Sequence, residues 1–307
     1  MIKVSDIAYV RFRAPDLDIM EDYLLNFGMV RSARTDTALY MRGVGQDHTV
    51  HITELGDEPA FLGFAMNAQS KDDLDRFAKA NDLAVEERTE PGAGFHCKIK
   101  DPDGYSIEIV FGIEKPIELP RRHDQAVNTS KETGRPNEPV RQQAGPSRVV
   151  RLGHIAIDVS NYAASFSWYN EKLGLIKSDE VFIGDESAVL GGFTRCDCGD
   201  KPVDHHTIFL VGTGAPKFGH AAFEVENLDD LMIGRYVLEE NNYTLVWGVG
   251  RHILGSQIFD YWRDPWGNVL EHWTDGDVYD NSVPSQLNSI EALMGNQWGK
   301  PAPTDMA

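Results

Sequence analysis

The sequence predicts an α+β protein of two domains, each built from two strand–helix–strands modules. The second half of the chain repeats the order of strands, helices and turns of the first half. Each half closes on an Asp-Pro-x-Gly turn, at 101–104 and 264–267, and such a turn is expected to launch a strand. The 307 residues also suit two domains of roughly 100–200 residues each. The four modules begin near residues 5, 61, 150 and 217.

The first and third modules each contain a strand, a turn and an amphipathic helix. Apolar residues recur three or four positions apart in "LDIMEDYLLNF" and in "YAASFSWYNEKL", so each helix has one apolar stripe. Gly28 and Gly174 stand where a left-handed residue would end each helix. The stripes consist of Leu17, Met20, Leu24 and Phe27 in one helix, and Tyr162, Phe166, Tyr169 and Leu173 in the other.

The second and fourth modules lie at 61–83 and 218–243. Both show a strand, a polar turn followed by "DDL", and a helix. The stretch between the two halves, 114–147, is polar, contains prolines and has no period, as is typical of a linker. A helical stretch near 286–294 is expected to pack on the second domain. We therefore predict an N-terminal domain at 1–115, a linker at 116–149, a C-terminal domain at 150–277 and a tail at 278–307.

The composition excludes some partners. A net charge of −19 argues against nucleic acid and anionic membranes, which both bind basic surfaces. No apolar run reaches the ~20 residues of a membrane helix, and "MIKVSDIAYVRF" lacks the features of a signal peptide. Three cysteines, Cys97, Cys196 and Cys198, give no disulfide framework and fit a reducing compartment. A cytoplasmic protein is the expectation.

Histidines concentrate in the second half, where alignment of the repeats places two of them opposite a tyrosine and a phenylalanine, and a glutamate opposite a glutamate. The aligned pairs are His154 with Tyr9, His220 with Phe64, and Glu271 with Glu108. Each of the two histidines shares a strand face with an alanine two residues on, which leaves room for a metal and its ligand. Two histidines and one carboxylate leave positions open for substrate and O2 on Fe(II), and zinc is chemically sound as well.

The segment Gly250–Glu271 resembles the signature of type I extradiol ring-cleaving dioxygenases of the vicinal oxygen chelate superfamily. The signature runs Gly-x-His, a spacer, an apolar residue, Tyr, two residues, Asp-Pro-x-Gly and Glu. This chain supplies Gly250, His252, Tyr261, Asp264, Pro265, Gly267 and Glu271. Asp260 departs from the pattern, because it stands where an apolar residue is expected. The resemblance implies a two-domain fold in which each pair of βαβββ modules forms an open, barrel-like mixed sheet.

The resemblance also implies site residues. His154, His220 and Glu271 would be the metal ligands, for Fe(II) or in some members Mn(II). His206, in "DHHTIFL", would be the acid–base histidine, with His205 beside it at the substrate. Strand alternation leaves open that His205 instead points away from its neighbour.

His252 and Tyr261 would be catalytic groups that hydrogen-bond the substrate. His272 is expected to face away from the metal, and one of the four tryptophans near this segment (Trp247, Trp262, Trp266 and Trp273) could line the pocket. Members that accept carboxylate-bearing catechols place an arginine before the histidine, but Arg251 should alternate away from His252.

The expected activity is extradiol cleavage of an uncharged, substituted catechol or trihydroxybenzene with O2, in aromatic-compound catabolism. The protein is expected to be a homo-oligomer, and its N-terminal domain is expected to bind no metal. Two alternatives stay open at this point. One is a non-redox metal-dependent isomerase or lyase of the glyoxalase type, which usually needs a fourth protein ligand. The other is a protein that binds aromatic ligands without chemistry.

Overall fold

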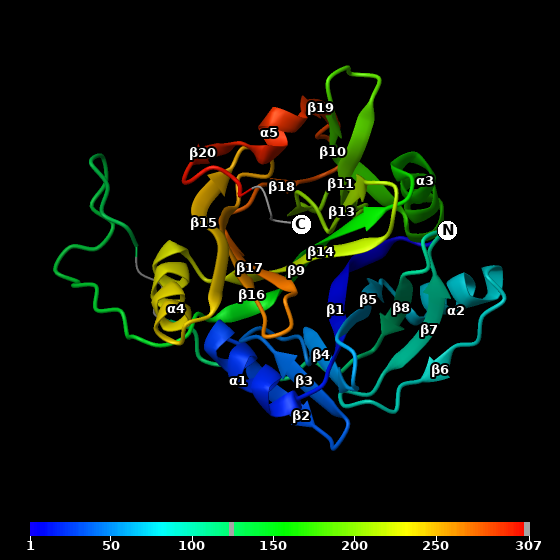
Figure 1. The fold of residues 1–307 in the computed structure, drawn as a ribbon, viewed down its shortest axis with the longest axis horizontal. Helices are drawn as coiled ribbons and strands as arrows, with labels where there is room; N and C mark the ends of the chain where they lie inside the picture. Colours follow the sequence, from blue (N-terminus) through cyan, green and yellow to red (C-terminus); the bar gives the residue numbers. More distant parts are fainter. Residues whose placement is uncertain (123–125, 304–307) are drawn as a thin grey trace.

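The computed structural model describes residues 1–122 and 126–303, whose two halves form separate sheets (Figure 1). The first half forms an eight-stranded sheet in the order β2-β3-β4-β1-β5-β8-β7-β6. Its elements are β1 (Val4–Ala14), α1 (Leu17–Phe27), β2 (Val30–Arg34), β3 (Ala38–Arg42), β4 (His51–Leu55), β5 (Ala60–Ala68), α2 (Lys71–Ala80), β6 (Glu86–Glu87), β7 (Phe95–Lys100) and β8 (Ser106–Phe111).

The second half forms a ten-stranded sheet in the order β19-β10-β11-β13-β9-β14-β17-β16-β15-β20, and β12 pairs separately with β18. Its elements are β9 (Val149–Val159), α3 (Tyr162–Leu173), β10 (Leu175–Phe182), β11 (Val189–Cys196), β12 (Val203–Asp204), β13 (Ile208–Gly212), β14 (Lys217–Val225), α4 (Leu228–Glu240), β15 (Thr244–His252), β16 (Ile258–Arg263), β17 (Val269–Thr274), β18 (Val278–Tyr279), β19 (Gln286–Ser289), α5 (Ile290–Met294) and β20 (Asn296–Trp298).

The predicted fold class is confirmed, because each half contains two strand–helix–strands modules joined into one mixed sheet. Within each half the two opening strands pair antiparallel, β1 with β5 and β9 with β14. Helices α1 and α3 end on Gly28 and Gly174, whose φ angles of 105° and 71° are left-handed, as predicted. None of the described helices is long and apolar enough to span a membrane.

The two halves share one apolar core where β1 and β9 lie beside each other (Figure 1). Phe12 and Phe61 of the first half pack on Phe218 of the second half, with ring centroids 5.2 and 4.3 Å apart. His272 is buried in this junction and does not reach the metal-ligand cluster. Its ring stacks on Phe27 at 3.8 Å, and its Nε2 lies 2.6 Å from the Phe27 carbonyl oxygen.

The stretch between the sheets has no named helix or strand in its described part, and its boundaries with the two domains stay a prediction. It is nevertheless attached to the second half. The Arg122 guanidinium pairs with the fully buried carboxylate of Asp230 on α4, and Arg122 also donates to the carbonyls of Gly145 and Pro146. A buried ion pair of this kind holds the chain in one path over the domain.

The C-terminal tail is part of the second sheet. The predicted helical stretch near 286–294 is correct only for its last five residues, which form α5. The first four form β19, which pairs in parallel with β10 from Asp179 to Phe182. Strand β20 then pairs with β15, so the tail flanks both ends of this sheet (Figure 1).

His51 at the start of β4 makes part of the stability depend on pH. Burial lowers the pKa of His51 to about 3, and its Nε2 has no hydrogen-bond partner among the described residues. A histidine in the unfolded chain has a pKa near 6.5. Between pH 6.5 and pH 3 the unfolded state therefore binds more protons than the folded state, and the folded state loses stability as the pH falls through that range.

We expect His51→Phe, which keeps the stacking on Phe12, to remove this loss. At pH 5 the histidine costs about 2 kcal/mol relative to pH 7.5, because each pKa unit is worth ~1.4 kcal/mol. Urea unfolding at the two pH values measures the difference. Equal pH dependence in wild type and variant would show that His51 is not responsible.

Candidate active site

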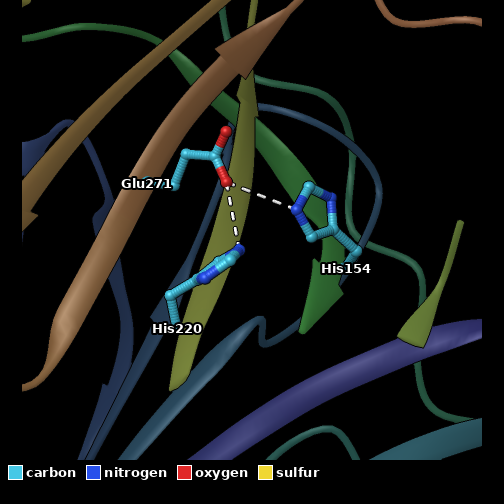
Figure 2. A group of neighbouring side chains, drawn as sticks. All are labelled: His154, His220 and Glu271. Carbon is cyan, nitrogen blue, oxygen red and sulfur yellow. Dashed lines mark ion pairs between the residues drawn. The ribbon is translucent and has the colours of Figure 1, made fainter. Parts of the chain in front are cut away.

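Three neighbouring strands bring His154, His220 and Glu271 together (Figure 2). His154 lies on β9, His220 on β14 and Glu271 on β17. Ala222 pairs with both His154 and Glu271, so these two side chains flank β14 on one face of the sheet. The Nε2 atoms of both histidines lie 3.3 Å from Oε2 of Glu271. The structure therefore assembles the three residues that the repeat and the signature singled out.

The chemistry of this cluster fits a divalent metal. Glu271 is fully buried, and neither of its carboxylate oxygens has a hydrogen-bond partner in the described part of the chain. Burial by itself raises the pKa of Glu271. The neighbouring His154 and His220 together have a larger effect in the opposite direction, so the pKa lies well below its usual range. Burial likewise lowers the pKa of His154. An ionised Glu271 and a neutral His154 are in the protonation states that metal binding requires.

A cavity of about 280 Å³ opens beside the cluster. Its walls are mostly apolar, and no lysine or arginine of the described residues lines it. Asp158 is the one carboxylate among the described residues that line it, whereas His154 and His220 of the cluster also line it. The apolar lining consists of Ala156, Phe193, Phe209, Val211, Trp247, Leu254, Val269, Leu293 and Met294.

His252 and Tyr261 face this cavity from the hairpin of β15 and β16. Their Nε2 and phenol oxygen are 2.9 Å apart, and Tyr261 lies opposite Glu271 in the β16–β17 ladder. Burial, assisted by the nearby Glu271 charge, raises the pKa of Tyr261 well above its usual value. Burial lowers the pKa of His252 to about 4. The cavity therefore contains a protonated phenol beside a neutral imidazole.

The departure from the signature at Asp260 has a structural reason. Neighbouring residues of a strand face opposite sides, so Asp260 points away from the cavity that Tyr261 lines. Its carboxylate is fully buried, 2.7 Å from Arg235 of α4, and accepts a hydrogen bond from the Trp262 indole at 2.8 Å. The apolar residue that the signature expects is replaced here by a buried ion pair.

His205 and His206 both lie in the bend between β12 and β13, where strand alternation does not apply. His206 lines the cavity, with its ring 4.0 Å from the His154 ring. Burial and neighbouring histidines lower the pKa of His206 well below 6.5. His205, expected at the substrate, does not line the cavity. It lies behind His206, with its Nε2 2.8 Å from Oδ2 of Asp179.

The corresponding place in the first half is filled by the protein itself. Ala65 pairs with both Tyr9 and Glu108, as Ala222 pairs with His154 and Glu271. The Tyr9 phenol donates to Glu108 at 3.1 Å, and the Arg11 guanidinium lies 2.9 Å from the same carboxylate. Glu108 thus has a protein cation as its partner, and that the first half binds no metal stays a prediction.

The register corrects one alignment made from the sequence. Counting from Ala65 and Ala222 places Gly63, and not Phe64, at the position of His220. A glycine offers no side chain to a metal, so the prediction that this position lacks a ligand is unaffected. Its φ of 142° and the close approach of the Ser106 carbonyl leave no space for a β-carbon.

Several lining residues were not identifiable from the sequence. Of the four tryptophans near the hairpin, Trp247 is the one that lines the cavity. Leu293 and Met294 reach it from α5, more than twenty residues beyond the signature. Arg251 does not line it, in agreement with the expectation, and instead pairs with Asp275 at 2.6 Å.

The chain is similar to known proteins in sequence and in fold. Residues 151–272 match the family described as "Glyoxalase/Bleomycin resistance protein/Dioxygenase superfamily". Metapyrocatechase 2 of Cupriavidus necator is 28% identical over 276 residues, covering 89% of this chain and 82% of that protein.

Two solved structures share the fold. One is the Mn(II)-bound glyoxalase from Novosphingobium aromaticivorans, with a TM-score of 0.79, 22% identity, and coverage of 99% of this chain and 94% of that chain. The other is an extradiol ring-cleaving dioxygenase from B. fuscum, with a TM-score of 0.78, 17% identity, and coverage of 99% and 82%. The resemblance predicted from the signature is confirmed for the second half: residues 151–272 match the glyoxalase/bleomycin resistance protein/dioxygenase superfamily, and the chain is similar along most of its length to a metapyrocatechase and to an extradiol dioxygenase.

Proposed function

We propose that the protein is a metal-dependent extradiol dioxygenase that opens a catecholic ring with O2. The observation that carries this proposal is the His154–His220–Glu271 cluster at the end of an apolar cavity, with His206, His252 and Tyr261 around it. Metapyrocatechase 2, a relative along most of its length, is named for the same kind of substrate. The expected homo-oligomeric state and cytoplasmic location stay predictions.

His154, His220 and Glu271 would hold the metal, with Fe(II) as the first choice and Mn(II) as the second. This donor set is the facial triad of non-haem iron oxygenases, which keeps several positions open. When bound, such a metal acidifies a coordinated hydroxyl and brings the substrate and O2 together at one ion. The chain offers three ligands here, one fewer than the glyoxalase-type alternative usually needs.

The other polar groups of the cavity orient the substrate and move its protons. Tyr261 can donate its phenol proton to a substrate oxygen that gains negative charge, and His252 fixes the direction of that phenol. His206, which lines the cavity, would accept a proton from a substrate hydroxyl and return it later. The apolar walls exclude water from these exchanges, which strengthens each electrostatic interaction in the cavity.

The lining favours a substrate with an apolar substituent. No cation of the described residues faces the cavity, and the pKa of Asp158 is raised by burial in its wall. A carboxylate-bearing catechol would therefore be buried without a partner charge, next to an acidic group. Phe193, Phe209 and Leu293 instead offer apolar surface to an alkyl or aryl group.

We expect alkyl- or aryl-substituted catechols to be turned over with a kcat/KM roughly 10- to 100-fold above that of unsubstituted catechol, since each buried methylene is worth ~0.8 kcal/mol. A carboxylate-bearing catechol should fall below both. Initial rates of O2 uptake with the three compounds measure the order. A preference for the carboxylate would contradict this assignment of the cavity.

The activity itself is tested on protein loaded with Fe(II) without oxygen and then mixed with O2 and a panel of catechols. Consumption of O2 and formation of a coloured ring-opened product are expected. Failure with every catechol, together with O2-independent turnover of another substrate in the Zn(II)- or Ni(II)-loaded protein, would support the isomerase or lyase alternative.

A further inference from the structure

Asp179, His205 and His206 form a hydrogen-bonded chain that ends at the cavity. Oδ2 of Asp179 lies 2.8 Å from Nε2 of His205, and Nδ1 of His205 lies 3.0 Å from Nδ1 of His206. All three residues are buried. His206 lines the cavity, so its Nε2 is the ring nitrogen left for a substrate. The chain thus runs from β10, outside the cavity, to the proposed acid–base group.

The direction of this chain follows from its first member. A carboxylate can only accept, so His205 must donate from Nε2 to Asp179. In the neutral form of His205, which has one donor and one acceptor nitrogen, Nδ1 is then the acceptor. Nδ1 of His206 is then the donor across the 3.0 Å contact, and its Nε2 has no proton.

A second contact identifies Asp179 as an acceptor. Its other oxygen, Oδ1, accepts a hydrogen bond from the side-chain amide of Asn288 at 3.1 Å. Asn288 lies on β19, the strand of the C-terminal tail that pairs with β10. Asn288 thus supplies a donor to Oδ1 while Nε2 of His205 lies at Oδ2, an arrangement that two accepting oxygens satisfy, and the tail helps to hold Asp179.

The His205 ring has little freedom to turn over and reverse the chain. Phe193 and Tyr279 pack on it with ring centroids 5.3 Å away. Gly255 approaches so closely that a β-carbon there would lie 3.0 Å from Nδ1 of His205. The backbone N–H of His205 donates to the Asp277 carbonyl at 2.9 Å.

We propose that Asp179 is a positioning residue that, through His205, keeps the proton of His206 on Nδ1 and presents an unprotonated Nε2 to the substrate. This inference rests on the proposed function for its catalytic meaning, but the proton location is a property of the protein alone. A histidine held in this tautomer is ready to accept a proton from a catechol hydroxyl. The opposite tautomer would direct a donor at the substrate.

The test reads the tautomer directly. Metal-free protein labelled with ¹⁵N-histidine is studied by NMR at a pH where the ring is neutral, and His206→Phe assigns the signal. We expect Nε2 of His206 to have the shift of an unprotonated nitrogen and Nδ1 that of a protonated one. Asp179→Leu should populate both tautomers, whereas Asp179→Glu should restore the wild-type pattern. A proton on Nε2 in the wild type would overturn the proposal, as would an unchanged pattern in Asp179→Leu.

Kinetics give the second measurement. Asp179→Leu should lower kcat roughly 10- to 100-fold, as is typical of a carboxylate that orients a histidine, with unchanged metal content. Glu180→Gln is the matched control, because this neighbour on β10 pairs with Tyr162 and Lys177 outside the chain. The control should keep both the NMR pattern and kcat, and a loss of kcat as large as that of Asp179→Leu would contradict the assignment. If the wild type shows the expected tautomer but consumes no O2, the proposed function fails and the tautomer assignment stands.

Discussion

Replacing Glu271 by glutamine is expected to remove the metal and with it the activity. The variant keeps the size of the side chain but removes the one negative charge between the Nε2 atoms of His154 and His220. An amide is a poor ligand for Fe(II) compared with a carboxylate, so bound metal should fall from about one ion per chain to almost none. Metal analysis after dialysis, followed by O2-uptake assays, measures both effects.

The repeat supplies the control for this experiment. Glu108 occupies the same place in the first half but is paired with Arg11, so Glu108→Gln should leave the metal content near one ion per chain. The control should lose stability instead, because Arg11 loses one partner of its buried cluster. Equal loss of metal from both variants would show that the site is not confined to the second half.

His206→Phe is expected to lower kcat by roughly 10² to 10⁴ while the metal stays bound, because general acid–base catalysis contributes about that much. The aromatic ring preserves the packing on Phe193, where the centroids are 4.7 Å apart. Stopped-flow measurements with an alkyl-substituted catechol should show that the substrate still binds while ring opening is slow.

The comparison variant is His272→Phe, a buried histidine next to Glu271 in sequence but on the other face of β17. It should lose stability, because the hydrogen bond to the Phe27 carbonyl is removed, and keep kcat within a factor of about three, because His272 does not line the cavity. A large loss of kcat in this variant but not in His206→Phe would reverse the two assignments.

Most residues of the candidate site could be predicted from the sequence, because they belong either to one local motif or to an internal repeat. His252, Tyr261 and Glu271 belong to one hairpin and the next strand, and the spacing in the signature reflects the pairing of Tyr261 with Glu271. His154 and His220 were found through the repeat. The sequence alignment of the two repeats was one residue off here, because it matched Gly63 with Gly219 and therefore Phe64 with His220. Similar letters do not reveal which residues face each other across strands, and a shift of one residue exchanges the two faces of a strand.

The remaining features depend on tertiary contacts that no local pattern contains. Alternation could not place His205, because the residue lies in a bend and not in a strand. Asp179 lies 26 residues from His205 in the chain, and only the fold brings them together. Leu293 and Met294 reach the cavity because β19 pairs with β10, an unforeseen extension of the sheet. The ion pair of Asp260 with Arg235 likewise becomes visible only when α4 packs on β16.

Because of Arg11, the buried glutamates of the two halves differ in the counter-charge that they need while the chain folds during biosynthesis. The first half leaves the ribosome with its own guanidinium as counter-charge for Glu108, and hydrogen bonds from the His96 ring and Arg11 lower the pKa of that buried carboxyl to about 2 against the effect of burial. We therefore expect the first half to fold without a metal ion. The second half emerges later with Glu271 buried and, among the described residues, without a hydrogen-bond donor, so we expect a bound metal to stabilise it. On this prediction the first half is folded before the second half takes up its metal, and β1 then offers β9 a finished surface to pack on.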